Sequence, residues 1–310
     1  MEKLKIIADL RGNFDCEPID TIFGFPQNLE VYTEKKSLLA MGAHHTAVSN
    51  IVKDYKDYYK MFFLPEEPQG VHCREAYDGI LSIENNFDLI FGQCPYVNIW
   101  REKYFNSPKR IHTFTPFDEK YIFPSENKEI DVYWTGTRKY KTFIDSINVV
   151  AKKFNSRIVD FRQHVPLTHN EKMILNGKSK ISITYALLFM TGEMQLISEI
   201  PHWNDCEAFK DYNNTGFVPQ MKTRVYEAAF SKSLILHKKD PWNVIEFWFE
   251  PEKEFIYYDN EKELEEKINE ILKNYGAYYH IAENAYNKAI NNYTTKHYIE
   301  KYIIPNTKEN

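Results

Sequence analysis

At 310 residues the chain exceeds the usual size of one compact core, so two domains of ordinary size are expected. Its composition is 43% hydrophobic and 15% aromatic, without low-complexity tracts or internal repeats, which excludes a disordered tail or a repeat array. The net charge of -5 excludes a general electrostatic attraction to nucleic acid or to an anionic membrane.

The opening segment, MEKLKIIADLRG, has an apolar run too short for a signal peptide, and no run approaches the roughly 20 residues of a membrane span. We therefore expect a cytoplasmic protein. Its cysteines show neither CxxC spacing nor a zinc-ligand pattern, which predicts buried free thiols and no metal site. They are Cys16, Cys73, Cys94 and Cys206.

Short apolar runs bounded by turn residues predict strands along the whole chain. They are KIIADL (5–10), FDLIFG (87–92), RIHTF (110–114), DVYWTG (131–136), SRIVDF (156–161), KISITYA (180–186), SLILH (233–237) and EFIYY (254–258). Most of these runs lack polar alternation, and runs that are apolar on both faces are typical of a parallel sheet covered by helices on both sides.

Two helices are predicted near the C-terminus, over residues 259–274 and 278–290. In the first, Asn260 can cap the helix with Glu263 three residues later, and leucines and isoleucines form one apolar stripe. Strands and helices alternate on both sides of a linker-like stretch, TPFDEKYIFPSENKE (115–129). This alternation predicts the α/β class of the doubly wound type, with a domain on each side of the linker.

The segment DVYWTGTRKYKTF predicts an anion site at a strand-to-helix turn. Gly136 would follow the strand, and Arg138 and Lys141 would stand beside the start of the next helix. A glycine there lets a phosphate approach the backbone, and an arginine adds a charge-assisted hydrogen bond. An ordinary turn with solvated cations fits the same residues, so this interpretation stays open.

The segment KTRVYEAAF (222–230) predicts an apolar helix that carries two charges on one face, Arg224 and Glu227, three residues apart. A carboxylate can accept two hydrogen bonds from vicinal ribose hydroxyls, and an arginine fork matches a diphosphate. Together these two side chains would hold a nucleotide. A helix-surface ion pair has the same spacing, and spacing alone does not separate the two interpretations.

The order of these features resembles the C-terminal half of GT-B glycosyltransferases, over roughly residues 109–303. The resemblance is to the bacterial group that includes the spore-maturation CgeB-like proteins and the family 1-like glycosyl transferase domain. It rests on the strands DVYWTGTR and KISITYA, a long loop, KTRVYEAAFSKSLILHKKD, EFIYYDNEKELEEKINEIL and IAENAYNKAINNYT. A similar R-V-x-E helix occurs in a phage DNA β-glucosyltransferase.

The resemblance implies a GT-B fold, in which two Rossmann-like domains with parallel sheets face an interdomain cleft. Residues 1–117 would form the acceptor-side domain and residues 118–283 the nucleotide-sugar-binding domain. The C-terminal helix, about 284–310, would pack back on the first domain. This fold needs no bound metal, because cationic side chains and helix N-termini neutralise the leaving diphosphate.

The resemblance also assigns roles to individual residues. Glu227 would bind the donor's ribose, Arg224 would reach the diphosphate, and Arg138 would match a phosphate contact, with Lys222 as a further cation at the donor. Retaining members often show two glutamates eight residues apart, but position 219 here is Pro. The donor-sugar contact and the stereochemical outcome are therefore unassigned. A UDP- or GDP-sugar is the expected donor, and no other cofactor is expected.

Two residues of the N-terminal half are hypotheses for the catalytic base, which must lie within hydrogen-bond reach of an acceptor hydroxyl. Asp15 follows the first strand in DLRGNFDCEP, and His44 lies in AMGAHHTAV. A turn carboxylate and a solvated histidine pair explain the same residues without chemistry.

The sequence thus predicts a metal-independent glycosyltransferase that moves a sugar from a nucleotide-diphosphate donor to a glycan or other hydroxyl acceptor. One alternative is a sugar transferase of the same fold acting on a hydroxymethylpyrimidine of DNA, against which the negative net charge weighs. The other alternative is a non-catalytic nucleotide-binding protein, since a fold does not determine an activity.

Overall fold

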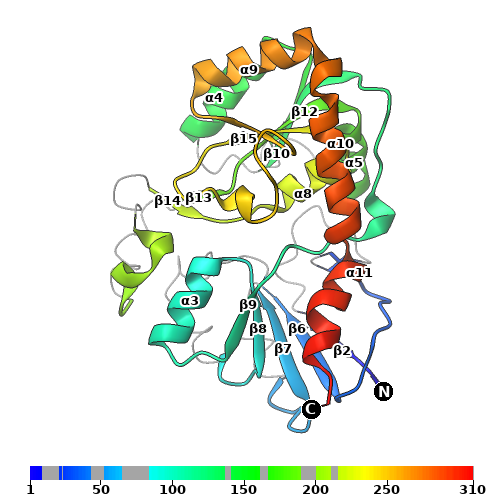
Figure 1. Cartoon of the computed structure of the whole chain (residues 1–310), viewed down its shortest axis with the longest axis vertical. Coiled ribbons are helices and arrows are strands. Elements are labelled where there is room, and N and C mark those ends of the chain that lie inside the picture. Colours follow the sequence, from blue (N-terminus) through cyan, green and yellow to red (C-terminus); the bar gives the residue numbers. More distant parts are fainter. Residues whose placement is uncertain are drawn as a thin grey trace. The chain divides into compact units, whose positions relative to one another are not determined.

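The computed structural model in Figure 1 describes residues 1–8, 21–22, 24–42, 52–64, 84–136, 141–160, 167–189, 200–210 and 216–309. The chain divides into two compact units. Unit 1 comprises Met1–Pro116, Leu187–Gln220 and Thr295–Asn310, and unit 2 comprises Phe117–Ala186 and Met221–Thr294. Residues 187–220, which the sequence analysis assigned to the second domain, thus fall in unit 1.

Unit 1 is built on a five-stranded parallel sheet in the order β2-β6-β7-β8-β9. Its strands are β2 (Lys5–Ala8), β6 (Ser37–Met41), β7 (Tyr59–Leu64), β8 (Leu89–Gly92) and β9 (Lys109–His112). Strands β6 and β8 are buried along their whole length, as expected for the interior of a covered parallel sheet. The sequence analysis predicted β2, β8 and β9 but missed β6 and β7.

Shorter elements complete unit 1. Two antiparallel pairs lie near the N-terminus, β1 (Glu2–Lys3) with β5 (Tyr32–Thr33) and β3 (Thr21–Ile22) with β4 (Phe25–Pro26). A third joins β13 (Leu187–Phe189) to β14 (Phe217–Pro219). The helical elements are α3 (Pro95–Tyr104), the 3-10 turns η4 (Trp203–Asp205) and η5 (Glu207–Phe209), α11 (Thr295–Tyr298), the π-helical turn η7 (Ile299–Ile303) and α12 (Ile304–Asn306).

The segment 200–210 packs on α3 through an apolar cluster. Trp100 from α3 contacts the ring of Phe209, and its indole N–H donates to the carbonyl of His202 at 2.7 Å. The cluster also contains Cys94 and Cys206, which are buried free thiols as predicted. These contacts show why the described segment 200–210 folds with unit 1, because its apolar side chains Ile200, Cys206, Ala208 and Phe209 are buried in this cluster.

A buried ion network joins α3 to β9. The carboxylate of Glu84 accepts from Arg101 Nη2 at 2.5 Å and from Arg110 Nη1 at 2.8 Å, and all three side chains are at most 3% exposed. Arg110 Nε also donates to Asn98 Oδ1 at 2.9 Å. Two guanidinium charges thus share one carboxylate inside unit 1.

The C-terminal segment is anchored in unit 1 by Tyr298, whose side chain is fully buried. Its ring makes edge-on contacts with four phenylalanines, Phe25, Phe63, Phe91 and Phe114, at centroid distances of 5.3–5.8 Å. Its hydroxyl hydrogen-bonds to Thr113 Oγ1 at 3.3 Å. Several aromatic pairs meeting at one ring make this segment part of the core of unit 1.

Unit 2 contains a second five-stranded parallel sheet, in the order β11-β10-β12-β15-β16. Its strands are β10 (Ile130–Gly136), β11 (Ser156–Asp160), β12 (Ser179–Thr184), β15 (Leu234–Lys238) and β16 (Ile256–Tyr258). All five were predicted from their apolar runs, with ends shifted by a few residues. With a parallel sheet in each unit, the predicted α/β class is confirmed.

Helices cover both faces of the unit 2 sheet (Figure 1). They are α4 (Lys141–Ala151), α5 (His169–Gly177), α8 (Thr223–Phe230), α9 (Glu261–Lys273) and α10 (Tyr275–Asn292), with the 3-10 turns η3 (Glu119–Tyr121) and η6 (Val244–Phe247). Helix α4 packs against α9, whereas α8 packs against both α5 and α10. The predicted cap of α9 is present, because Asn260 accepts from the backbone N–H of Glu263.

None of the helices in the described part of the chain is long and apolar enough to cross a membrane.

Candidate functional site

The carboxyl ends of the unit 2 strands meet at one edge of the sheet, where α/β proteins bind ligands. Gly136 at the end of β10 lies beside Asp160 of β11, and Thr184 of β12 lies beside His237 of β15. Helices α5 and α8 each precede a strand of this sheet, so both begin near that edge.

Arg224, in the first turn of α8, reaches the end of β10. A β-carbon on Gly136 would lie 2.9 Å from Arg224 Nη2 and 2.9 Å from the Trp134 ring. Real β-carbons do not make such close contacts, so a larger residue at position 136 would force the guanidinium or the Trp134 ring to move. Gly136 and Arg224, two residues predicted for the donor site, therefore lie together.

Among the described residues, the guanidinium of Arg224 contacts aromatic rings and forms no ion pair with a carboxylate. Its Cζ lies 5.1 Å from the ring centroid of Tyr185 and 5.9 Å from that of Trp134. Nη1 is buried, and within the described residues it has no hydrogen-bond acceptor. A buried, charged donor without an acceptor is unfavourable unless a ligand supplies one. The geometry therefore fits an anion.

The start of α8 adds to this positive environment. Lys222 is the N-cap residue, no side chain caps the helix, and its first turn contains no acidic residue. Helix N-termini expose backbone N–H groups and carry a partial positive charge, which favours phosphate groups.

Glu227, one turn further along α8, is 3% exposed and forms an ion pair with Lys172 from α5, with Nζ 2.6 Å from Oε1. Burial is the largest single influence and would raise the pKa of Glu227, but Lys172, His169 and Arg224 together outweigh it and hold the pKa below its ordinary value. Glu227 is thus an ionised carboxylate. Its ion pair is with Lys172, so the alternative of an Arg224–Glu227 surface pair does not describe this helix.

His169, the first residue of α5, lies beside this pair. Its ring packs edge-on against Tyr121 at a centroid distance of 4.8 Å and lies tilted against Phe117 at 5.8 Å. Burial, with the nearby Lys172 charge, lowers the pKa of His169 to about 4, so its imidazole is neutral at neutral pH. Nδ1 is buried and bonds to no other described residue.

The sequence analysis missed Lys172 and His169. They lie on α5, which begins with a capping box in which Thr168 accepts from the Glu171 N–H and Glu171 accepts from the Thr168 N–H. The pattern T-H-N-E before the apolar pair M-I is the signal that predicts this helix start. No local pattern pairs Lys172 with Glu227, because the two residues are 55 positions apart.

Three predicted site residues, Asp15, His44 and Arg138, lie outside the described residues. Their roles, and the roles assigned to Lys222 and Glu227 by resemblance, stay predictions.

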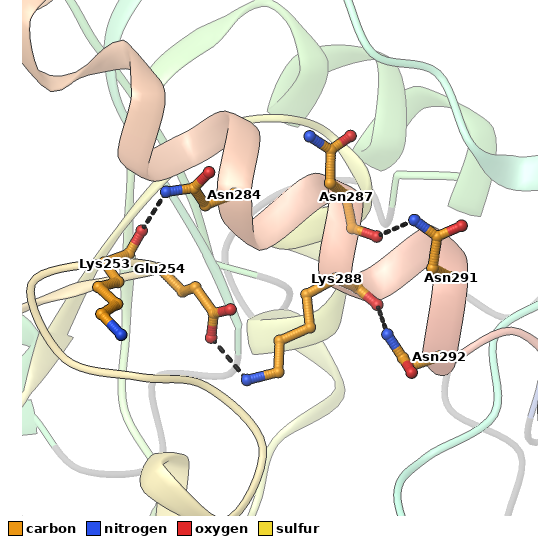
Figure 2. Close-up of a pocket in the computed structure, with 7 residues that line it drawn as sticks. All are labelled: Lys253, Glu254, Asn284, Asn287, Lys288, Asn291 and Asn292. Carbon is orange, nitrogen blue, oxygen red and sulfur yellow. Dashed lines mark hydrogen bonds and ion pairs between the residues drawn. The ribbon is translucent and has the colours of Figure 1, made fainter.

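Unit 2 also contains an open groove of about 410 Å³ along α10, lined by Lys253, Glu254, Asn284, Asn287, Lys288, Asn291 and Asn292 (Figure 2). Lys288 donates to Glu254 at 2.8 Å, and Asn291 and Asn292 each donate to a backbone carbonyl one turn earlier. Lys253 is paired with Glu250 at 2.7 Å. Because both lysines are already paired, this groove offers no counterpart to Arg224.

Comparison with known proteins supports the fold. The sequence model of the glycosyl transferase-like family matches residues 203–303, about a third of the chain, and this stretch includes α8. No curated protein matches the sequence significantly.

Several solved glycosyltransferases share the fold at low sequence identity. A TarM variant of S. aureus, solved with Fondaparinux, alpha-GlcNAc-glycerol and UDP, matches 87% of this chain and 55% of its own, with 12% identity and a TM-score of 0.58. The pneumococcal O-GlcNAc transferase GtfA, solved with UDP and GlcNAc, matches 87% and 56%, with 10% identity and a TM-score of 0.55. Sucrose-phosphate synthase of Thermosynechococcus elongatus matches 83% and 70%, with 8% identity and a TM-score of 0.53.

The chain has the fold of the GT-B glycosyltransferases, and the predicted resemblance to them is confirmed at this level. The chain spans just over half the length of TarM and GtfA.

Proposed function

We propose that the chain is a glycosyltransferase that transfers a sugar from a nucleoside-diphosphate sugar to an acceptor hydroxyl, with the donor bound by unit 2. The observation that carries this proposal is the guanidinium of Arg224. It lies at the end of β10 and the start of α8, and its buried Nη1 has no acceptor in the described part of the chain. A diphosphate supplies acceptor oxygens and negative charge at this place.

Transfer of the sugar breaks the bond between the anomeric carbon and the diphosphate, so negative charge develops on the leaving oxygen. Arg224 and the uncapped start of α8 are donors aimed at that charge, and such preorganised donors stabilise a transition state without a metal ion. Metal independence is therefore part of the proposal. Glu227, kept ionised by Lys172, would accept the ribose hydroxyls.

We propose a uridine or guanosine diphosphate sugar as the donor and a glycan or other hydroxyl compound as the acceptor. The support for uridine is that the TarM and GtfA structures contain UDP. Asp15 and His44 remain the hypotheses for the base that takes the acceptor's proton.

A thermal-shift panel with UDP, GDP, ADP, CDP and dTDP tests the donor site. A ligand present at 100 times its dissociation constant should stabilise the folded state by about 2.7 kcal/mol, which is visible as a higher Tm. We expect one nucleotide to shift the wild type and Arg224→Met to lose the shift. Arg157→Met is the matched control, because Arg157 is exposed on β11 of the same unit. If no nucleotide shifts the wild type, the proposed function is wrong.

A further inference from the structure

Lys128 lies in the segment that precedes β10, and its ammonium binds three backbone carbonyls. Nζ lies 2.7 Å from the oxygen of Gly177, 2.8 Å from that of Lys232 and 3.3 Å from that of Ser231. Within the described residues, no carboxylate lies within ion-pair distance of this ammonium.

The three carbonyls belong to the C-terminal ends of two helices. Gly177 is the last residue of α5, and Ser231 and Lys232 directly follow α8. The last carbonyls of a helix have no partner within it and carry its partial negative charge. A single cation therefore satisfies the ends of both helices at once.

The two helices point the same way. Helix α5 leads into β12 and α8 leads into β15, and these strands are parallel neighbours in one sheet. Aligned helix dipoles side by side repel each other, and a cation at their shared negative end offsets this repulsion. At their opposite, positive ends the same alignment favours an anion.

Both helices carry the residues of the candidate site. Helix α5 supplies Lys172, α8 supplies Arg224 and Glu227, and the Lys172–Glu227 ion pair joins them at mid-length. Each helix is short, 9 and 8 residues, or roughly 12–14 Å long at 1.5 Å per residue. A sliding or tilting of one helix at its C-terminal end therefore moves the site residues of that helix relative to the other.

The surroundings of Lys128 support a close fit at this end. A β-carbon on Gly177 would lie 2.2 Å from the carbonyl oxygen of Phe123, so the segment before β10 packs directly on the end of α5. Burial lowers the pKa of Lys128 to about 8, while Glu126 raises this pKa and Lys232 lowers it further. Burial thus disfavours the charge of this amine, and its three hydrogen bonds to carbonyls offset that cost.

We propose that Lys128 is a positioning residue for the donor site: by binding the C-terminal carbonyls of α5 and α8, it sets Arg224 relative to the Lys172–Glu227 pair. This inference rests on the proposed function, in which these residues bind a nucleoside diphosphate. Lys128 itself does not touch the donor, because it acts at the other end of both helices.

The test compares Lys128→Met, which keeps most of the side-chain length without the ammonium, with Lys128→Arg, which keeps the charge and the donors. Lys178→Met is the control, because Lys178 follows α5 at the same end but forms only an exposed pair with Glu129 at 3.2 Å. Affinity for UDP is measured by calorimetry on the full chain. Hydrogen exchange of the amides in α5 and α8 is measured in parallel without nucleotide.

We expect Lys128→Met to weaken UDP binding roughly 5- to 30-fold. It should also accelerate exchange in α5 and α8 but not in unit 1, whereas Lys128→Arg and Lys178→Met should stay close to the wild type. Unchanged UDP affinity in Lys128→Met would overturn the inference and leave the proposed function intact.

Other outcomes are also decisive. If the wild type binds no nucleotide, the proposed function fails, and the exchange experiment alone decides whether Lys128 couples α5 to α8. In that case equal exchange in Lys128→Met and Lys178→Met overturns the coupling. If Lys128→Met does not fold, Lys128→Gln takes its place. Loss of the folded state in both variants would show that Lys128 is needed for the fold itself and overturn the positioning role.

Discussion

Units 1 and 2 both bury charged side chains beside a five-stranded parallel sheet, but the charges are partnered differently. In unit 1, Arg101 and Arg110 both bind Glu84, and the network joins α3 to β9. In unit 2, Glu227 forms its ion pair with Lys172. The buried Nη1 of Arg224 bonds to none of the described residues. Buried charges that bind one another stabilise the fold, whereas a buried donor without an acceptor indicates a ligand-binding site.

The largest effect is expected when the unit 1 network is broken. Glu84→Gln leaves two buried guanidinium groups without a counter-charge, which should destabilise the fold by about 3–5 kcal/mol. Urea unfolding measures the loss. Lys3→Met is the control, because the Lys3–Glu30 pair is exposed to solvent and its loss should change stability little. Similar losses in the two variants would contradict a structural role for the network.

A change at Gly136 should act on binding, with some loss of stability as well, because an added methyl group would also lie 2.9 Å from the buried Trp134 ring. In Gly136→Ala the added methyl group would displace the Arg224 guanidinium, because it would lie 2.9 Å from Nη2. We expect UDP affinity to fall about 10- to 100-fold, the equivalent of one charge-assisted hydrogen bond. Calorimetry measures this loss. Unchanged affinity would mean that the guanidinium does not bind the nucleotide from its observed position.

The pH dependence of stability should report on a partly buried histidine in each unit, His112 in unit 1 and His169 in unit 2. Burial lowers the pKa of His112 in unit 1 and of His169 in unit 2 to about 4. An unfolded histidine has a pKa of about 6.5, so below that pH the unfolded chain binds the proton first. Each histidine's contribution is therefore fully present above pH 6.5 and is lost as pH falls towards 4, at about 1.4 kcal/mol per pH unit.

Urea unfolding between pH 7 and 4.5 measures this slope. His169→Phe should reduce this slope by the amount that corresponds to the uptake of about one proton on unfolding, and His112→Phe should reduce it by the same amount. A residual slope should remain in both variants, because burial lowers the pKa of His237 to about 3. A slope that neither substitution changes would contradict the buried, neutral state of these imidazoles.

The smallest effect is expected from removing a single hydroxyl at the C-terminal anchor of unit 1. Tyr298→Phe keeps the ring among the four phenylalanines and removes only the hydroxyl that bonds to Thr113, so we expect a loss of about 1 kcal/mol. Tyr298→Ala removes the ring as well and should cost about 3–5 kcal/mol. Thermal unfolding of the two variants measures both losses of stability. Equal losses would mean that the aromatic cluster does not hold the C-terminal segment.

The sequence predicted unit 2 better than unit 1, and the reason lies in the side chains. The strands of unit 2 include DVYW and KISIT, whose β-branched and aromatic residues are typical of strands. The missed strand β6 reads SLLAM, and Leu, Ala and Met favour helices in isolation. Its burial in the parallel sheet decides its structure, and this tertiary effect is not visible in a local window.

The candidate site was predictable to the extent that it lies on one helix. Arg224 and Glu227 stand in a single short motif, and Gly136 follows a clear strand, so local patterns suggested all three. Lys172 and His169 enter the site only because α5 packs against α8. Lys128 was assigned to a linker, since nothing in the sequence around it indicates that it binds carbonyls of residues 49, 103 and 104 positions away.

The placement of residues 187–220 in unit 1 has a practical consequence for dissecting the molecule. The chain passes from one unit to the other at residues 116/117, 186/187, 220/221 and 294/295, so truncation at a single point separates neither unit. The segment 187–220, however, begins and ends with the antiparallel strands β13 and β14, in which Leu187 lies opposite Pro219. The Cα atoms of residues paired in this way are about 5 Å apart. Replacing residues 187–220 by a linker of about two residues between Ala186 and Met221 would therefore make unit 2 one continuous polypeptide. Such a minimal module would carry the whole unit 2 sheet, its helices and the candidate-site residues Arg224 and Glu227.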